Sequence, residues 1–252
     1  MKSLRKSLNN SEILIGSWIT IGSPAVAELM AGCNFNWLAI DLEHSSISLA
    51  MAENMIRVIE LNGVAPLVRL SSNNYVQIKR VMDAGAHGII VPMIKTEADV
   101  KAAIDAVKYP PEGSRSVGLA RAQGFGNNFE RYWKWQQDHA VVVAQIEHDD
   151  AVNNIDEIFS VKGLNGYILG PYDLSASLGV PGDFDSEIYK SAVDRIEEAA
   201  KYHGVPGGVH IIEPDEEALL NCLKRGNKFI AYSIDFKMID KTCRDALAKI
   251  EA

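Results

Sequence analysis

Short hydrophobic runs recur along this chain, and segments with a helical pattern separate most of them. The runs cover residues 13–18, 37–40, 65–68, 88–91, 141–146, 166–169, 207–210 and 229–233. Runs this short and this continuously apolar are typical of strands buried on both faces of a parallel sheet. Between them, apolar positions such as Val193, Ile196 and Ala200 recur with the spacing of one helix face. The alternation predicts an α/β fold, a single (β/α)8 TIM barrel that spans residues 1–252 as one domain.

Glycine follows several of the expected helices just before the next hydrophobic run. Gly32, Gly85, Gly204 and Gly226 occupy this position. Because glycine adopts the left-handed conformation that closes a helix without steric cost, we expect these residues to be helix C-caps.

The longest stretch without an expected strand runs from residue 110 to residue 138. It contains four glycines and then a group of aromatic residues that includes Trp133 and Trp135. A connection of this length is more often functional than idle. Two interpretations stay open: the segment is a lid or a subunit contact, or it is a surface excursion packed on its own aromatic cluster.

Composition narrows the class of protein. The chain has 252 residues and a net charge of -8 without a dense Lys/Arg block, which argues against nucleic acid as a partner. No apolar stretch approaches the roughly 18 to 20 residues that span a bilayer, so no membrane partner is expected. The three cysteines, Cys33, Cys222 and Cys243, form no CxxC pair. Together with the lack of a recognisable signal peptide, this predicts reduced thiols in a cytoplasmic protein.

Two acidic residues stand just after neighbouring strands. Glu147 directly follows the run at 141–146, and Asp173 lies shortly after the run at 166–169. The carboxyl ends of parallel strands share one face of a barrel, and that face carries the active site of TIM-barrel enzymes. Two carboxylates there are a suitable start for a hard divalent cation. The pattern therefore predicts a metal site formed by Glu147 and Asp173.

The same rim collects polar residues from two more strands. Asp41 and His44 follow the second run, and Arg69 follows the third. An imidazole with a reference pKa of about 6.5 is a candidate base at neutral pH, and a guanidinium group is a permanent cation. The coincidence of these residue types at the ends of four strands predicts an active site more strongly than any one of them does.

Each of these residues also has a purely structural interpretation. Asp41 and Asp173 are suited to be helix N-caps. Glu147 and Arg69 are suited to be ion-pair partners, and an isolated His44 would be a solvated loop residue. The joint placement favours function over these alternatives.

Motifs along nearly the whole chain resemble the HpcH/HpaI aldolase family. They include Asp41-Leu42-Glu43-His44, Val91-Pro92-Met93, Tyr109-Pro110-Pro111-Glu112-Gly113, Gln145-Ile146-Glu147 and Gly170-Pro171-Tyr172-Asp173-Leu174-Ser175. The resemblance implies a barrel of the phosphoenolpyruvate/pyruvate-binding type and a class II aldolase, which is a carbon–carbon lyase. Such an enzyme reversibly cleaves a 2-keto-3-deoxy (4-hydroxy-2-oxo) acid to pyruvate and an aldehyde with the help of a divalent metal.

The resemblance also implies a role for each matched residue. Glu147 and Asp173 match the ligands of Mg²⁺ or Mn²⁺, with Co²⁺ as a further alternative. His44 matches the catalytic base, Arg69 the residue that stabilises developing negative charge, and Asp83 a carboxylate that raises the basicity of the histidine. The expected substrate-binding residues are Arg69, Gln145, Gly170, Pro171, Tyr172, Asp173 and His210. Asp41 is expected to contact these residues rather than the substrate.

The chemistry explains why these residue types are needed. Aldol cleavage removes a proton from the 4-hydroxyl group and leaves the enolate of pyruvate. A divalent ion on the keto oxygen and carboxylate polarises the carbonyl, Arg69 supplies charge at the enolate oxygen, and His44 moves the proton. The competing Schiff-base route needs a lysine on a barrel strand. None of the eight runs contains lysine, which favours the metal route.

Two other functions stay open at this point. The same enolate site would support decarboxylation of oxaloacetate or condensation of an enolate with a different acceptor. A barrel that only binds a metabolite or assembles, without catalysis, is the remaining alternative. The intact set of polar residues at four strand ends argues against it.

The half of the site that would meet the aldehyde departs from the family pattern. His210 ends the seventh run where relatives usually carry aliphatic residues, and we expect it to favour a polar or acidic aldehyde; the alternative is an ordinary strand-end histidine. Tyr232 and Ser233 in the eighth run would narrow or polarise the pocket. Arg115 and Arg121 are candidates to hold a carboxylate or phosphate.

The resemblance further suggests a homo-oligomer, commonly a hexamer with helices exchanged between neighbours. Exposed aromatic residues near Trp133 and Trp135 are compatible with an interface. Local packing under the long connection is the alternative.

Overall fold

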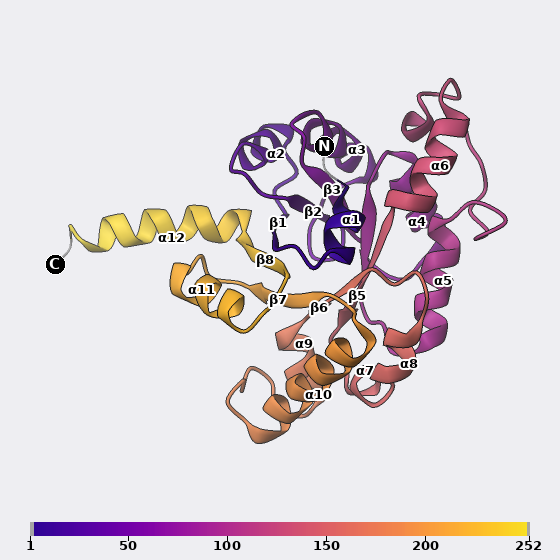
Figure 1. Cartoon of the computed structure of the whole chain (residues 1–252). Coiled ribbons are helices and arrows are strands. Elements are labelled where there is room, and N and C mark those ends of the chain that lie inside the picture. Colours follow the sequence, from indigo (N-terminus) through magenta and orange to yellow (C-terminus); the bar gives the residue numbers. More distant parts are fainter. Residues whose placement is uncertain (1–2, 251–252) are drawn as a thin grey trace.

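Eight parallel strands close into a barrel in the computed structural model, which describes residues 3–250 (Figure 1). The strands are β1 (Leu14–Ile19), β2 (Trp37–Asp41), β3 (Ala65–Arg69), β4 (Gly88–Val91), β5 (Val141–Ile146), β6 (Gly166–Leu169), β7 (Gly207–Ile211) and β8 (Phe229–Ile234). Each strand pairs with its neighbours in chain order, and β8 closes the barrel by pairing with β1. The predicted TIM barrel is confirmed, and each strand begins and ends within one residue of its expected run.

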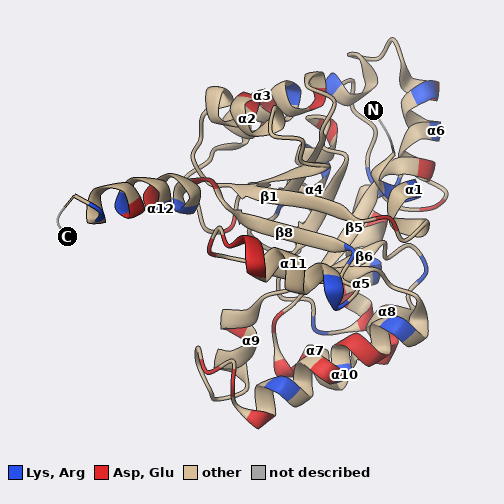
Figure 2. Cartoon of the chain, turned by 60° about the vertical axis from the view of Figure 1, so that its left-hand side comes forward, with Lys and Arg blue, Asp and Glu red and all other residues tan. Residues whose placement is uncertain are grey.

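Helices connect the strands, and most of them cover the outside of the barrel. They are α1 (Leu4–Asn9), α2 (Pro24–Ala31), α3 (Leu49–Leu61), α4 (Tyr75–Asp83), α5 (Glu97–Val107), the short 3-10 helix η1 (Arg121–Gln123), α6 (Phe129–His139), α7 (Asp149–Asn153), α8 (Ile155–Ser160), α9 (Pro171–Ser177), α10 (Glu187–His203), α11 (Glu216–Lys224) and α12 (Asp235–Ala248). Acidic and basic residues are interspersed on helices such as α10 and α12 (Figure 2). Within residues 3–250, no helix is both long enough and apolar enough to cross a membrane.

Three of the four expected glycine caps are confirmed. Gly85, Gly204 and Gly226 have φ angles of 103°, 68° and 88° and close α4, α10 and α11 in the left-handed conformation. The expectation for Gly32 is wrong, because this residue keeps a φ of -73° and continues the helical geometry. The left-handed residue after α2 is Asn34, with a φ of 63°, and asparagine tolerates this conformation better than most residues.

Large aromatic side chains fill the interior of the barrel. Trp37 stacks on Phe229 with ring centroids 4.5 Å apart, and Trp18 meets Trp37 edge-on at 6.3 Å. A Cβ atom at Gly16 would lie 2.0 Å from the Trp37 ring, so β1 needs glycine at this point. The barrel is therefore a packed core rather than a channel.

The long connection packs on its own aromatic cluster within one chain. Arg115 is fully buried, with its guanidinium 4.0 Å from the centre of the Tyr109 ring and 5.3 Å from that of Tyr132. Arg121 donates to the carbonyl of Ala84 at 3.0 Å, just after α4, which is the amino-terminal side of the barrel. Within one chain, neither arginine reaches the face that carries the predicted site.

The last helix, α12, extends away from the barrel instead of packing against it (Figures 1 and 2). Its first residue, Asp235, is buried and accepts hydrogen bonds from the backbone N–H groups of Thr20 and Ile21 at 2.9 and 2.7 Å. Asp235 is the only described residue of α12 that is buried, and Phe236 and Ile239 are about half exposed. The start of the helix is anchored to the residues that follow β1, whereas most of its apolar side chains are exposed.

Candidate active site

Glu147 is a buried carboxylate at the carboxyl end of the barrel. Only 2% of its surface is exposed. The backbone N–H of Met93 donates to its Oε1 at 2.7 Å, and the side-chain amide of Gln145 donates to its Oε2. Met93 itself has a left-handed φ of 53°. The loop after β4 and the last residues of β5 thus hold this carboxylate in one orientation.

Gly170 brings β6 unusually close to the same carboxylate. A Cβ atom on Gly170 would lie 2.5 Å from Oε2 of Glu147, so no larger residue fits without displacing the acid. Gly170 is also the N-cap residue of α9, and Asp173 follows in the first turn, exposed to solvent. The interpretation of Asp173 as an N-cap is therefore wrong, and its carboxylate has no capping role.

Several carboxylates converge at this point. Burial is the main cause that raises the pKa of Glu147, and the charges of Glu43 and Asp173 raise it further, although hydrogen bonds from Gln145 and Met93 act in the opposite direction. Such an arrangement is electrostatically unfavourable unless protons or a cation neutralise it. Oxygen donors of this kind suit a hard divalent ion, so the residues present fit the predicted metal.

Asp41 and Arg69 form a bidentate ion pair beside the carboxylates. The Nε and Nη2 atoms of Arg69 lie 2.9 and 2.7 Å from the two oxygens of Asp41. Asp41 is fully buried, and although burial alone would raise its pKa, hydrogen bonds and the charge of Arg69 hold the pKa below its usual value. Asp41 also accepts from the backbone N–H groups of Glu43 and His44 at 2.9 and 3.2 Å. The buried pair therefore shapes the turn that presents His44.

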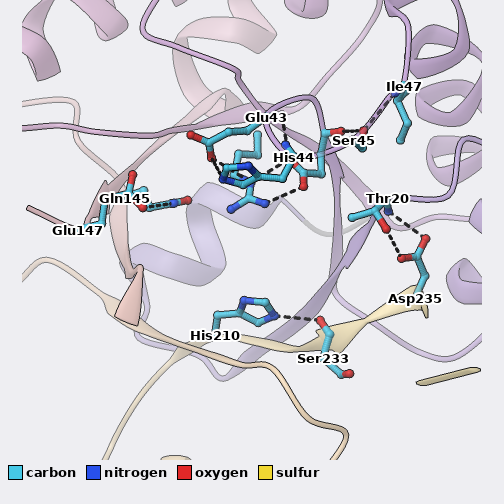
Figure 3. A network of polar contacts seen from close by, with 12 residues as sticks. Thr20, Glu43, His44, Ser45, Ile47, Gln145, Glu147, His210, Ser233 and Asp235 are labelled. Atoms are coloured by element: carbon cyan, nitrogen blue, oxygen red, sulfur yellow. Dashed lines mark hydrogen bonds and ion pairs between the residues drawn. The ribbon is translucent and has the colours of Figure 1, made fainter. Parts of the chain in front are cut away.

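His44 itself is largely solvent-exposed and lies next to an acid that sequence reasoning missed. Its Nε2 atom is 3.6 Å from Oε2 of Glu43, which lies 3.5 Å from Nε of Arg69 (Figure 3). Oε2 of Glu43 is buried and makes no hydrogen bond to any residue of the described range. Burial raises the pKa of Glu43 to about 7, against the charge of Arg69 and with help from Asp41 and Asp173. The signal for this residue was its place inside the Asp41–His44 motif.

Asp83 does not join these residues within one chain. It is the last residue of α4, which runs from the carboxyl end of β3 back toward the amino end of β4. Burial raises its pKa, and the charges of Arg115 and Lys79 lower it. Its Oδ1 atom is buried without a hydrogen-bond partner among residues 3–250. The resemblance implies that Asp83 raises the basicity of His44, and within one chain Asp83 lies at the opposite end of the barrel.

A separate group of His148, Asp149 and Asp150 also brings three ligand atoms within 4.8 Å of one another. Its geometry has a local cause. His148 is the N-cap of α7, and its Nδ1 accepts from the backbone N–H of Asp150 at 3.1 Å. Asp150 is exposed and Asp149 partly so, so this group is adequately explained as a solvated helix start.

His210 lies on the opposite side of the carboxyl end of the barrel, which forms the mouth of the candidate site. Its Nε2 atom lies 3.3 Å from the carbonyl oxygen of Ser233, and its ring centre is 5.6 Å from that of Trp18. The guanidinium of Arg69 lies 4.4 Å from the same Trp18 ring. Figure 3 shows His210 across the mouth from Glu43 and His44, with Gln145 and Glu147 on one side. Tyr172 is 57% exposed and meets Phe184 edge-on.

A sequence profile described as HpcH/HpaI aldolase/citrate lyase matches residues 14–241, which is most of the barrel just described. The chain belongs to this family. A hydroxypyruvate/pyruvate aldolase from Sagittula stellata is 38% identical over 236 residues, covering 93% of this chain and 92% of the relative. A 4-hydroxy-2-oxo-heptane-1,7-dioate aldolase from Shigella sonnei is 32% identical and covers 99% and 95%.

The three-dimensional comparison agrees. A solved structure of an HpcH/HpaI aldolase/citrate lyase family protein from Burkholderia cenocepacia is 29% identical and superposes with a TM-score of 0.92 over 99% of both chains. This member of the HpcH/HpaI family thus shares the barrel of a solved relative over its full length, and the resemblance seen in its sequence motifs is confirmed.

We predict that the metal-free protein loses stability as the pH rises through the range of Glu43 titration. The folded-state pKa of about 7 lies above the ordinary value of 4.5, so the folded state binds more protons than the unfolded state between these values. The stabilisation that Glu43 contributes is fully present below about pH 4.5 and is lost as the pH rises toward 7. We expect the loss to lower the free energy of unfolding by on the order of 2 kcal/mol and the melting temperature by about 5 °C.

Thermal unfolding at pH 5 and pH 7.5 in the presence of a chelator measures this loss. Glu43→Gln should flatten the dependence, and excess Mn²⁺ should raise the melting temperature more at pH 7.5 than at pH 5. A melting temperature of the chelated protein that rises between these two pH values would contradict the assignment.

Proposed function

We propose that this protein is a metal-dependent aldolase that reversibly cleaves a 4-hydroxy-2-oxo acid to pyruvate and an aldehyde. The observation that carries the proposal is the buried Glu147 carboxylate, held by Gln145 and Met93 and surrounded by Glu43 and Asp173. A carbon–carbon lyase of this class needs a fixed cation site next to a permanent positive charge, and Arg69 supplies that charge. The aldolase names of the two relatives support the same reaction class.

The residues of the chain have distinct tasks in this reaction. Glu147 and Asp173 would hold Mg²⁺ or Mn²⁺, with Co²⁺ as an alternative. When bound, the ion polarises the 2-keto group and neutralises the charge of the pyruvate enolate. Arg69, oriented by Asp41, donates hydrogen bonds where negative charge develops on oxygen. Gln145 and the backbone from Gly170 to Asp173 shape the pocket for the pyruvoyl end.

Proton transfer falls to His44 and its neighbour. His44 is accessible to a substrate at the mouth, and we assign to it removal of the proton from the 4-hydroxyl group. Glu43, 3.6 Å from the His44 ring, is placed to favour the protonated imidazole after that transfer. In the direction of synthesis the same pair returns the proton to the new alkoxide.

We further propose that the protein works as a homo-oligomer, with a hexamer as the predicted state. The outward apolar side of α12 supports this, since Phe236, Ile239 and Leu247 lie on one side of the helix and are exposed in a single chain. If Asp83 assists His44 as the resemblance implies, a neighbouring copy must supply it, because the two residues lie at opposite ends of one barrel. We place the whole chain, as one domain, in the cytoplasm, in keeping with three cysteines that form no disulfide.

We predict that Glu147→Gln lowers catalysis of enolate formation by at least about 100-fold, because loss of a ligand costs no less than loss of the groups that orient it. Exchange of the pyruvate methyl protons with deuterium, followed by NMR with Mg²⁺ or Mn²⁺, measures this step without an aldehyde. The matched control is Glu157→Gln on the exposed surface of α8, which should leave the rate unchanged. Wild-type protein that shows no exchange with any divalent ion would refute the proposed function.

We predict that Ile239→Asp shifts the protein to smaller species, because it places a charge on the apolar side of α12 that an oligomer would bury. Light scattering after gel filtration measures the mass. Ala248→Asp adds the same charge on another side of the exposed helix and should keep the wild-type mass. A wild-type protein of about 28 kDa in solution, the mass of one chain, would contradict the proposed assembly.

A further inference from the structure

His210 is held in one tautomer. Its Nε2 atom faces the carbonyl oxygen of Ser233 at 3.3 Å. A carbonyl oxygen can only accept a hydrogen bond, so Nε2 must carry the proton. In the neutral imidazole this leaves Nδ1 as an acceptor with a free lone pair.

The backbone of β8 is bent to provide that carbonyl. Ser233 has a left-handed φ of 55°, which is strained for a residue other than glycine. The pairing register of β1 with β8 shifts between Gly16 and Trp18, at the same level of the barrel. The Ser233 carbonyl also accepts a hydrogen bond from Oγ of Ser17 at 3.2 Å, and the Ser233 hydroxyl donates to the carbonyl of Ile212 at 3.0 Å. These bonds stabilise Ser233 in its strained conformation, and its carbonyl fixes the orientation of His210.

The second nitrogen of His210 is left for a ligand. Nδ1 makes no hydrogen bond to any residue in the described part of the chain. The ring lies beside Trp18 and, in Figure 3, points from β7 toward the space in front of Glu43 and His44. Burial lowers the pKa of His210 to about 4, against the effect of the Ser233 bond, and the charge of Arg69 lowers it further. At neutral pH the group is therefore an uncharged acceptor.

No free cation accompanies it on this side of the mouth, as far as residues 3–250 show. Arg69 pairs with Asp41 and serves the enolate oxygen in the proposed reaction, and Lys237 pairs with Glu213. Arg115 and Arg121, which the sequence suggested as carriers of a distant carboxylate, lie on the other side of the barrel. A substrate tail that ended in a carboxylate would meet a neutral imidazole and no positive charge from its own chain.

We infer that His210 selects an aldehyde half that carries a hydroxyl group, by accepting a hydrogen bond from that hydroxyl at Nδ1. This inference rests on the proposed aldolase function and names the class of its second substrate. It keeps the polar half of the expectation drawn from the sequence. A site built around a fixed acceptor discriminates against analogues that lack the donor, because the acceptor is then desolvated without a partner.

The test compares the addition of pyruvate to two aldehydes by the metal-loaded enzyme: glycolaldehyde and acetaldehyde, which lacks only its hydroxyl group. The quantity compared between enzymes is the ratio of the two kcat/KM values. His210→Leu should lower the ratio of kcat/KM for glycolaldehyde to that for acetaldehyde by about tenfold, the effect of one lost hydrogen bond. Because each ratio is compared between enzymes, the intrinsic reactivities of the aldehydes cancel.

Two variants serve as controls. His203→Leu on α10, whose ring pairs with Asp156 at the surface, should keep the wild-type ratio. His210→Asn retains a polar atom near the position of Nδ1 and should recover part of the preference. The inference is overturned if the ratio is the same in wild type and His210→Leu. Deuterium exchange into pyruvate distinguishes failure of the proposed function from failure of this inference. If the wild type shows no exchange, the proposed function is wrong. If exchange occurs and the ratio is unchanged in His210→Leu, only the role of His210 is wrong.

Discussion

The site depends on one unfavourable interaction, the burial of the Glu147 carboxylate among other acids. Gly170 has no side chain because Glu147 occupies that space, and Met93 adopts a left-handed conformation with its N–H directed at the same group. Two donated hydrogen bonds stabilise the carboxylate only in part, since burial still raises its pKa. A divalent cation would neutralise this group of acids. The metal requirement of the proposed reaction would then follow from how β4, β5 and β6 meet.

The two sides of the mouth are built on different physical principles. On one side, charges oppose and balance one another: Asp41 fixes Arg69, and Glu43 lies between Arg69 and His44. On the other side a neutral imidazole is fixed by a strained serine. The charged side is suited to generate and hold an enolate. The neutral side is suited to select, by shape and hydrogen bonding, the aldehyde that reacts with the enolate.

The sequence allowed the barrel and most of the charged side to be predicted, because both depend on local order along the chain. Continuously apolar runs locate strands, and residues just after them, such as Glu147 and Arg69, must lie on one rim. The place of Asp83 within one chain could not be predicted, because motif order says nothing about which end of a helix a residue occupies in space. The places of Arg115 and Arg121 could not be predicted either, because the path of a long connection depends on tertiary packing. The fixed tautomer of His210 depends on the backbone conformation of Ser233, which no residue pattern revealed.

The most direct test of the central claim is to count Mn²⁺ ions bound per chain, by electron paramagnetic resonance of free Mn²⁺ during a titration at pH 7.5. Wild-type protein should bind one ion tightly per chain. Gly170→Ala, which changes no proposed ligand residue but drives a Cβ atom into the space of the Glu147 carboxylate, should weaken binding about tenfold or more. Gly22→Ala, whose added Cβ would lie at an ordinary 3.4 Å from its nearest neighbour, should bind like wild type. Wild-type protein that binds no Mn²⁺, or a Gly170→Ala protein with unchanged affinity, would contradict the account.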